Sequence, residues 1–323
     1  MLVIGSKYAY SFGRVKALEA ALIDKTQFKR MAEASTAAEA VKILSETSYA
    51  DLEGADIPTI ENVLQEELRK VYDLAQHTSP KREITDLIQL KYDFHNVKVL
   101  LKAETASREP AYLVPLGIVD IEKLKKALKE RLKDLPAPLA HAVEAARLMY
   151  EETGDAQTID FVMDSEYTRT LLEHSKESSF LREFFKLKID LENIRNFVRC
   201  QKFKVDFAKA YLDGGTIDVK TFLSFEGEPV ETVINAVQTR KYNSVVEEGL
   251  KGYEETGSLT LYEKLTEDFL IEYLKKAKMV TLGIEPLIGY ILAKEREVKQ
   301  IRLILLGKLK GVDIEKRMSD PYV

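Results

Sequence analysis

One short pattern occurs three times in this chain, and it constrains the fold more than any other feature of the sequence. The pattern is an acid, two residues of any type, an amide, an aliphatic residue and a base. Its copies begin at Asp93, Asp190 and Glu297, which are 97 and 107 residues apart. A repeat of about a hundred residues predicts that the chain is built from three related units.

Two further matches lie in the same order along the chain. The segment Tyr-Glu-Glu-Thr-Gly occurs at residues 150–154 and again at 253–257, an offset of 103. Downstream of each copy of the first pattern, a glycine precedes an aspartate that opens a helical pattern, at Asp120, Asp218 and Asp313. Aspartate in such a place is typical of a helix N-cap. Collinear matches of three kinds indicate internal duplication.

The local pattern is helical throughout. Apolar residues recur at the spacing of one helix face over residues 84–101 and 171–198, and no alternating strand pattern of useful length competes. Residues 301–309 are apolar nearly all round, which predicts a buried helix. We therefore predict an all-α fold. Proline and glycine clusters near 115 and 214 fall between repeats, so the predicted domains are 1–114, 115–213 and 214–323.

The repeated polar residues admit two interpretations. Asp and Asn are mediocre residues inside a helix, and a spacing of three places the acid and the amide on one face. They could form a catalytic or metal-binding site, or a buried pair that bonds a helix end or loop and so determines how elements pack. We favour packing. The positions are Asp93, Asn96, Asp190, Asn193, Glu297 and Gln300.

Several classes of function lose their usual support. The net charge is −5, from 48 basic and 53 acidic residues, which argues against a sequence-independent nucleic-acid binder. Cys200 is the only cysteine, and the four histidines show no metal-binding spacing. The chain also lacks a phosphate loop and the patterns GxGxxG and GxSxG. We therefore expect no cofactor, no metal and no nucleic-acid partner.

Two runs of basic residues are candidates for docking a partner, although most such runs are solvated helix faces. One lies at 123–133 and the other at 294–310. The candidate docking residues are Lys123, Lys126, Lys294, Arg296 and Lys299.

No direct membrane span is expected. The longest stretch without Asp, Glu, Lys or Arg is residues 110–119, much shorter than the roughly 20 residues of a spanning helix. The N-terminus is too weakly apolar for a secretory signal. We expect a cytoplasmic protein whose membrane association, if any, runs through a partner.

Residues 91–103, 190–195 and 294–302 resemble the C-type subunits of the V/A-type rotary ATPases and ATP synthases, known as the d-type subunits in eukaryotic vacuolar enzymes. The resemblance implies a funnel of three similar helical domains with pseudo-threefold symmetry. It also implies a non-catalytic central-stalk protein on the cytoplasmic face of the membrane. Its partners would be the D- and F-type subunits of the central shaft and the rotor ring of proteolipid subunits, and rotation coupled to proton or sodium-ion transport would pass through it.

The third copy departs from the other two. It has Glu297 and Gln300 in place of Asp and Asn, and Asp313 follows Glu297 after 16 residues, against 27 and 28 in the earlier copies. We therefore expect the third domain to dock differently. The alternative function is a free-standing helical-repeat scaffold that binds soluble partners.

Overall fold

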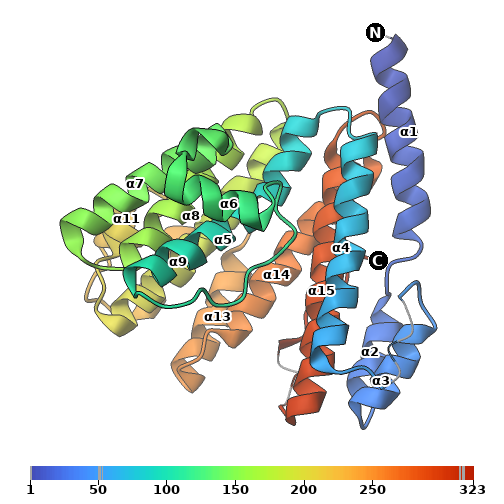
Figure 1. Cartoon of the computed structure of the whole chain (residues 1–323). Coiled ribbons are helices and arrows are strands. Elements are labelled where there is room, and N and C mark those ends of the chain that lie inside the picture. The colour runs from blue at the N-terminus through green and yellow to red at the C-terminus, as the bar shows by residue number, and fades with distance from the viewer. Residues whose placement is uncertain (1, 50–51, 53, 313, 315–316) are drawn as a thin grey trace. The chain divides into compact units, whose positions relative to one another are not determined.

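The computed structural model describes residues 2–49, 52, 54–312, 314 and 317–323, with side chains from residue 8 onward. All regular elements in this described part of the chain are helices, which confirms the all-α prediction (Figure 1). The chain divides into two compact units. Unit 1 comprises Met1–Thr85 and Thr239–Val323, and unit 2 comprises Asp86–Gln238. The predicted three-domain division stays a prediction.

Unit 1 is built around its last helix, α15 (Glu285–Lys310), which packs against α1, α2, α3, α4 and α14. Helix α4 runs beside it and buries a face that includes Leu64, Leu68 and Tyr72 (Figure 1). The other elements of unit 1 are α1 (Leu2–Glu19), α2 (Lys25–Glu33), α3 (Ala37–Ser45), α4 (Ile57–Thr78), α13 (Asn243–Thr256), α14 (Thr260–Lys275) and the 3-10 helix η3 (Lys276–Met279).

Unit 2 is built around α8 (Gln157–His174) and α9 (Ser179–Phe203). Helix α7 (Ala137–Thr153) pairs with α8, and α5 (Arg82–Thr105), which enters from unit 1, contacts α8 through Phe94 and Tyr167. The remaining elements are α6 (Ile121–Glu130), η1 (Leu132–Asp134), α10 (Phe207–Ala210), α11 (Val219–Leu223), η2 (Val230–Val233) and α12 (Ile234–Val237).

Two of the predicted helix caps lie in unit 2. Asp120 caps α6 and Asp218 caps α11, each by accepting hydrogen bonds from amides of the first turn, as predicted. The third predicted cap, Asp313, lies outside the described residues.

The two Tyr-Glu-Glu-Thr-Gly segments end α7 and α13. Gly154 and Gly257 both have φ of +66° and donate their N–H to the carbonyl oxygens of Tyr150 and Tyr253. A left-handed glycine ends a helix at little steric cost, since it has no Cβ. Each glycine is followed by a second helix that packs against the first, so the segment marks the same turn in both units.

The prediction that residues 301–309 form a buried helix is confirmed only in part. Ile301, Ile304 and Leu305 are buried, but Leu303 and Leu306 are half-buried and Leu309 is 47% exposed. The sequence of this stretch is apolar nearly all round, yet neighbouring elements cover only part of its circumference. An uncovered apolar strip therefore remains near the end of α15.

Candidate functional site

The first acid-amide pair holds the segment that follows its own helix. On α5, the Asn96 side chain both donates to the carbonyl oxygen of Val114 (2.9 Å) and accepts from its N–H (2.8 Å). Asp93 accepts the N–H groups of Ile118 (2.7 Å) and Val119 (3.1 Å). The two side chains thus replace the partners that these backbone groups would have in regular structure.

The second pair repeats this arrangement on α9. Asn193 makes the same two hydrogen bonds to the backbone of Leu212, both 2.8 Å long. Asp190 accepts the N–H groups of Thr216 (2.6 Å) and Ile217 (3.3 Å), and also the Thr216 hydroxyl. The repeat seen in the sequence is therefore a repeat of hydrogen bonding.

A glycine allows each carboxylate to approach the backbone this closely. A Cβ placed on Gly117 would lie 2.2 Å from Oδ1 of Asp93, and one on Gly215 would lie 2.3 Å from Oδ1 of Asp190. Neither distance is compatible with a side chain. These glycines are the ones that precede the capping aspartates, which explains why glycine and acid recur together.

The third pair differs at the acid and keeps one bond of the amide. On α15, Gln300 Nε2 donates to the carbonyl oxygen of Ser319 (2.7 Å), 19 residues downstream, as Asn193 does to Leu212. Glu297 instead accepts the N–H of Ile23 (2.6 Å) and the hydroxyl of Tyr49 (2.8 Å), both from the N-terminal part of unit 1. The third polar pair therefore has different partners from the first two, while the expected difference in domain docking stays a prediction.

Burial sets the electrostatics of these positions. Asp93, Asn96, Asp190 and Asn193 are 0% exposed. Burial raises the pKa of Asp93 to about 6, although the backbone N–H groups of Ile118 and Val119 lower it. Burial also raises the pKa of Tyr49, and the carboxylate of Glu297 adds to the effect. Since the carboxylates are closed off from solvent and bonded to backbone or side chains, their arrangement supports packing rather than chemistry.

The candidate docking residues fall into two groups. Lys123 and Lys126 on α6 and Lys299 on α15 are exposed. Lys294 is only 4% exposed and donates to Glu297 (2.6 Å), and the Arg296 side chain is 10% exposed and pairs with Asp268 (2.8 Å). Placing these two on a docking surface was wrong, because acids on α14 and α15 draw them into the interior of unit 1. The i, i+3 spacing of Lys294 and Glu297 was the available signal.

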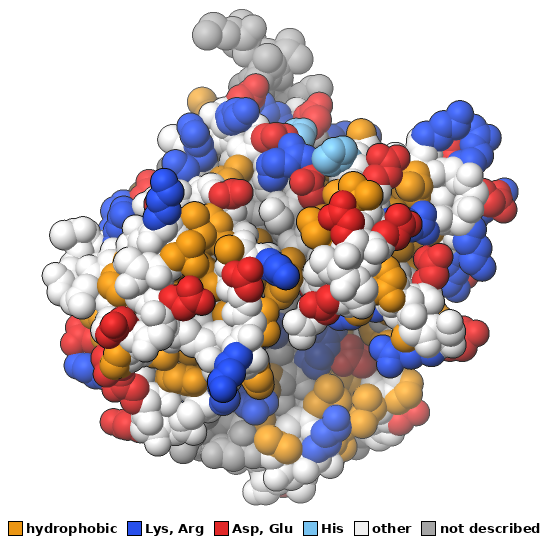
Figure 2. All heavy atoms as spheres, turned by 90° about the vertical axis from the view of Figure 1, so that its left-hand side faces the viewer, with side chains coloured by type: hydrophobic (Ala, Val, Ile, Leu, Met, Phe, Trp, Pro, Cys, Tyr) orange, Lys and Arg blue, Asp and Glu red, His pale blue; other side chains and the backbone are white. Residues whose placement is uncertain are grey.

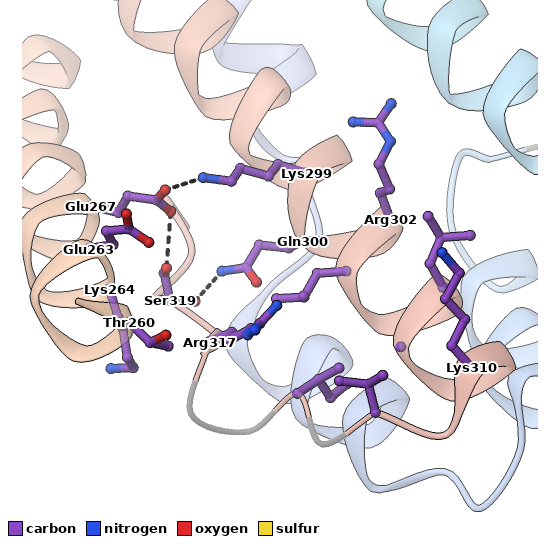
Figure 3. A pocket seen from close by; sticks show the side chains of 15 residues that line it. Thr260, Glu263, Lys264, Glu267, Lys299, Gln300, Arg302, Lys310, Arg317 and Ser319 are labelled. Carbon is purple, nitrogen blue, oxygen red and sulfur yellow. Dashed lines mark hydrogen bonds and ion pairs between the residues drawn. The ribbon is translucent and has the colours of Figure 1, made fainter. Parts of the chain in front are cut away.

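A groove between α14 and α15 was not predicted from the sequence. It has a volume of about 530 Å³. One of its walls is a stripe along α15, formed by Lys299, Leu303, Leu306 and Lys310. The spacing of these residues by four, three and four is the signal that could have revealed a common face. Figure 3 shows Gln300 between the two walls, bonded to Ser319.

Other kinds of site find no support in the described part of the molecule. It holds no cluster of three or more His, Cys, Asp or Glu side chains suited to a metal ion. None of its helices is both long and apolar enough to cross a bilayer. On the face drawn in Figure 2, basic and acidic side chains are interspersed, without the broad basic surface typical of nucleic-acid binders.

The fold and these positions define a class: all-α proteins with internal repeats, whose recurrent polar residues hold backbone segments in place. The model of the ATP synthase (C/AC39) subunit family matches residues 12–319, and the chain belongs to this family. It is 28% identical to the C-type subunit of the A-type ATP synthase of Methanocaldococcus jannaschii, over 99% of this chain and 87% of that protein. It is also 28% identical to the C-type subunit of the V-type sodium ATPase of Enterococcus hirae, over 95% and 97% of the two chains.

Proposed function

We propose that this protein is the non-catalytic central-stalk subunit of a V/A-type rotary ATPase. In this role it connects D- and F-type shaft subunits to the membrane rotor ring of proteolipid subunits. Rotation linked to ATP and to proton or sodium-ion transport passes through it on the cytoplasmic face of the membrane. The observation that carries the proposal is the family match over residues 12–319, together with relatives named as C-type subunits of ATP synthases and of a sodium ATPase.

The internal hydrogen bonding supports a part that transmits force. Asn96 and Asn193 each hold the following segment by two bonds, so the connections between helices are tied to the helices themselves. Close-packed interiors with few free connections are stiff and transmit strain. Three similar domains at 1–114, 115–213 and 214–323, arranged as a funnel, would suit a ring-shaped partner, and the sequence repeat supports that arrangement.

The decisive experiment is co-purification. The tagged protein is expressed in the organism from which it comes and is recovered from solubilised membranes. The subunits that co-purify with it are identified by mass spectrometry. The proposal expects both shaft subunits and the proteolipid ring. Recovery of the chain alone, or with soluble partners only, would exclude the rotor role and support the scaffold alternative.

The exposed lysines on α6 give a sharper second test. We expect the double variant Lys123→Glu/Lys126→Glu to lower recovery of the ring or the shaft at least severalfold, since charge reversal on an interface is costly. The matched control is Lys209→Glu/Lys220→Glu, an equal charge change at exposed residues of the same unit. Equal recovery of the ring and the shaft with both variants would show that these lysines of α6 are not part of the interface. Circular dichroism of each variant verifies that the helices persist.

A further inference from the structure

In the third repeat, only one of the two polar atoms of the amide has a hydrogen-bond partner among the described residues. In the first two repeats the amide oxygen accepts a backbone N–H, from Val114 and from Leu212, both at 2.8 Å. In the third, Gln300 still donates to Ser319, but its buried Oε1 has no hydrogen-bond partner among the residues that the structure describes. Gln300 is 4% exposed, and a buried acceptor without a donor is costly. The repeat itself indicates the missing group, which is a backbone N–H.

The unpartnered oxygen belongs to a residue that lines the groove between α14 and α15 (Figure 3). The stripe from Lys299 to Lys310 spans twelve residues of α15, a rise of roughly 16 Å. The middle of the stripe is apolar, since it consists of Leu303 and Leu306, and both of these side chains are half-buried. A groove of this length and character is suited to about five residues of extended chain.

The charge of the groove is unbalanced. Among the described residues that line it, five are basic and two, Glu263 and Glu267, are acidic. Three of the basic groups have partners: Lys264 pairs with Asp268, Lys299 with Glu267, and Arg302 with Glu61, which draws it away from the groove (Figure 3).

The remaining two basic side chains are Lys310 and Arg317. Both are exposed, and neither has an ion-pair or hydrogen-bond partner for its side chain within the described residues. The excess positive charge of the groove therefore lies on these two side chains.

We propose that this groove binds an acidic, partly apolar peptide segment of a partner protein. A backbone N–H of the segment donates to Gln300 Oε1, its apolar side chains cover Leu303 and Leu306, and its carboxylates pair with Lys310 and Arg317. The lining contains no aromatic residue among those described, so it offers a nucleotide base no stacking surface. Its unpaired cations are exposed, so a compact anion finds no enclosed charged pocket. The proposal does not depend on the rotor role, since the isolated full-length chain carries the whole groove.

The test uses fluorescence anisotropy with the isolated full-length protein at low salt. The probe is a labelled, end-capped peptide of alternating aspartate and leucine. We expect saturable binding that weakens at least tenfold in the double variant Lys310→Glu/Arg317→Glu. The matched control, Lys129→Glu/Lys133→Glu, reverses two exposed lysines in unit 2 and is expected to change binding less than twofold. Neither pair makes an ion pair in the described structure, so both variants are expected to fold.

Two further probes test the occupant itself. The same peptide with N-methylated amides has no N–H to donate, and we expect it to bind at least fivefold more weakly. A lysine-leucine peptide is expected not to bind. Absence of saturable binding, equal loss in the control variant, or full-strength binding of the N-methylated peptide would overturn the proposal. Complete competition by millimolar inorganic phosphate would also overturn it, and would indicate a site for small anions.

Discussion

At the scale of single residues, the acid-amide pairs act on backbone groups of the same chain. Asn96 and Asn193 each present a donor and an acceptor to one residue's backbone, which is the pairing a neighbouring strand would offer. This pair of hydrogen bonds requires an amide, because the side chain must offer a donor and an acceptor to the same backbone residue. This explains why amides recur at these positions inside otherwise apolar helices.

Substitution of Asn193 by leucine is expected to be strongly destabilising. It leaves the buried N–H and carbonyl of Leu212 without partners, at a cost of about 3 kcal/mol. Asn196→Leu is the comparison, since Asn196 lies one turn away, is half-buried and makes a single bond to Ala210. Its cost is expected to be about 1 kcal/mol. Urea denaturation measures both, and an unchanged free energy of unfolding for Asn193→Leu would contradict a packing role.

The raised pKa of Asp93 predicts a pH dependence of stability. Burial raises this pKa to about 6 from an ordinary value of 3.8, so the folded chain holds the proton more tightly than the unfolded chain. The contribution of protonated Asp93 to the free energy of unfolding is fully present below about pH 3.8. It is lost as the pH rises through 6, an effect of roughly 3 kcal/mol.

Asp93→Asn does not ionise and provides the test. The free energy of unfolding of wild type relative to this variant is expected to fall between pH 4 and pH 7. Urea titrations at several pH values measure the difference. A constant difference across that range would show that Asp93 does not titrate as its burial indicates.

At the scale of elements, the repeated unit is a pair of packed helices followed by a long helix that carries the polar pair. Helices α7, α8 and α9 form one such group, and α13, α14 and α15 form another. The turn inside each group is the same, down to the threonine hydroxyl that bonds back into the helix, at Thr153 and Thr256. The element order therefore reflects the same duplication as the sequence.

Equivalent turns should respond equally to mutation. Gly154→Ala and Gly257→Ala place alanine at φ of +66°, and a Cβ meets no atom within 4 Å at either site. Only backbone strain remains, so each variant is expected to lose about 1 kcal/mol. Gly13→Ala, at an exposed position inside α1 with similar free space, is expected to be neutral or stabilising. Thermal unfolding compares the three, and clearly unequal losses at Gly154 and Gly257 would contradict the equivalence.

At the scale of the whole molecule, the two units differ in how the chain builds them. Unit 2 is continuous, whereas unit 1 joins the two ends of the chain. The apolar faces of α1, α3 and α4 are covered by α15, which is encoded more than two hundred residues later. Glu297 strengthens this junction by bonding Ile23 and Tyr49. Unit 1 therefore requires both ends of the chain.

This difference predicts how fragments behave. A fragment of residues 82–238 keeps all of α5 and the rest of unit 2, and we expect it to unfold cooperatively by circular dichroism. A fragment of residues 1–85 lacks α15 and is expected to show no cooperative transition. Co-expression of 1–85 with 239–323 is expected to restore one. A cooperative transition in the 1–85 fragment alone would contradict the central role of α15.

The sequence by itself determined the helices, the repeat and the positions of the polar pairs. These follow from interactions over short separations: apolar spacing along one helix, caps within one turn, and side-chain hydrogen bonds that reach 18 or 19 residues along the chain. Such features leave a local pattern that can be read directly.

Only the tertiary structure decided the partners of Glu297, the burial of Lys294 and Arg296, and the groove between α14 and α15. Ile23 lies 274 residues from Glu297, and nothing in either local sequence indicates the other. Arg296 looks the same in the sequence whether Asp268, 28 residues away, pairs with it in the interior or water surrounds it. The exposed strip on α15 exists because neighbouring helices cover only part of an apolar surface, and that coverage depends on how the elements pack.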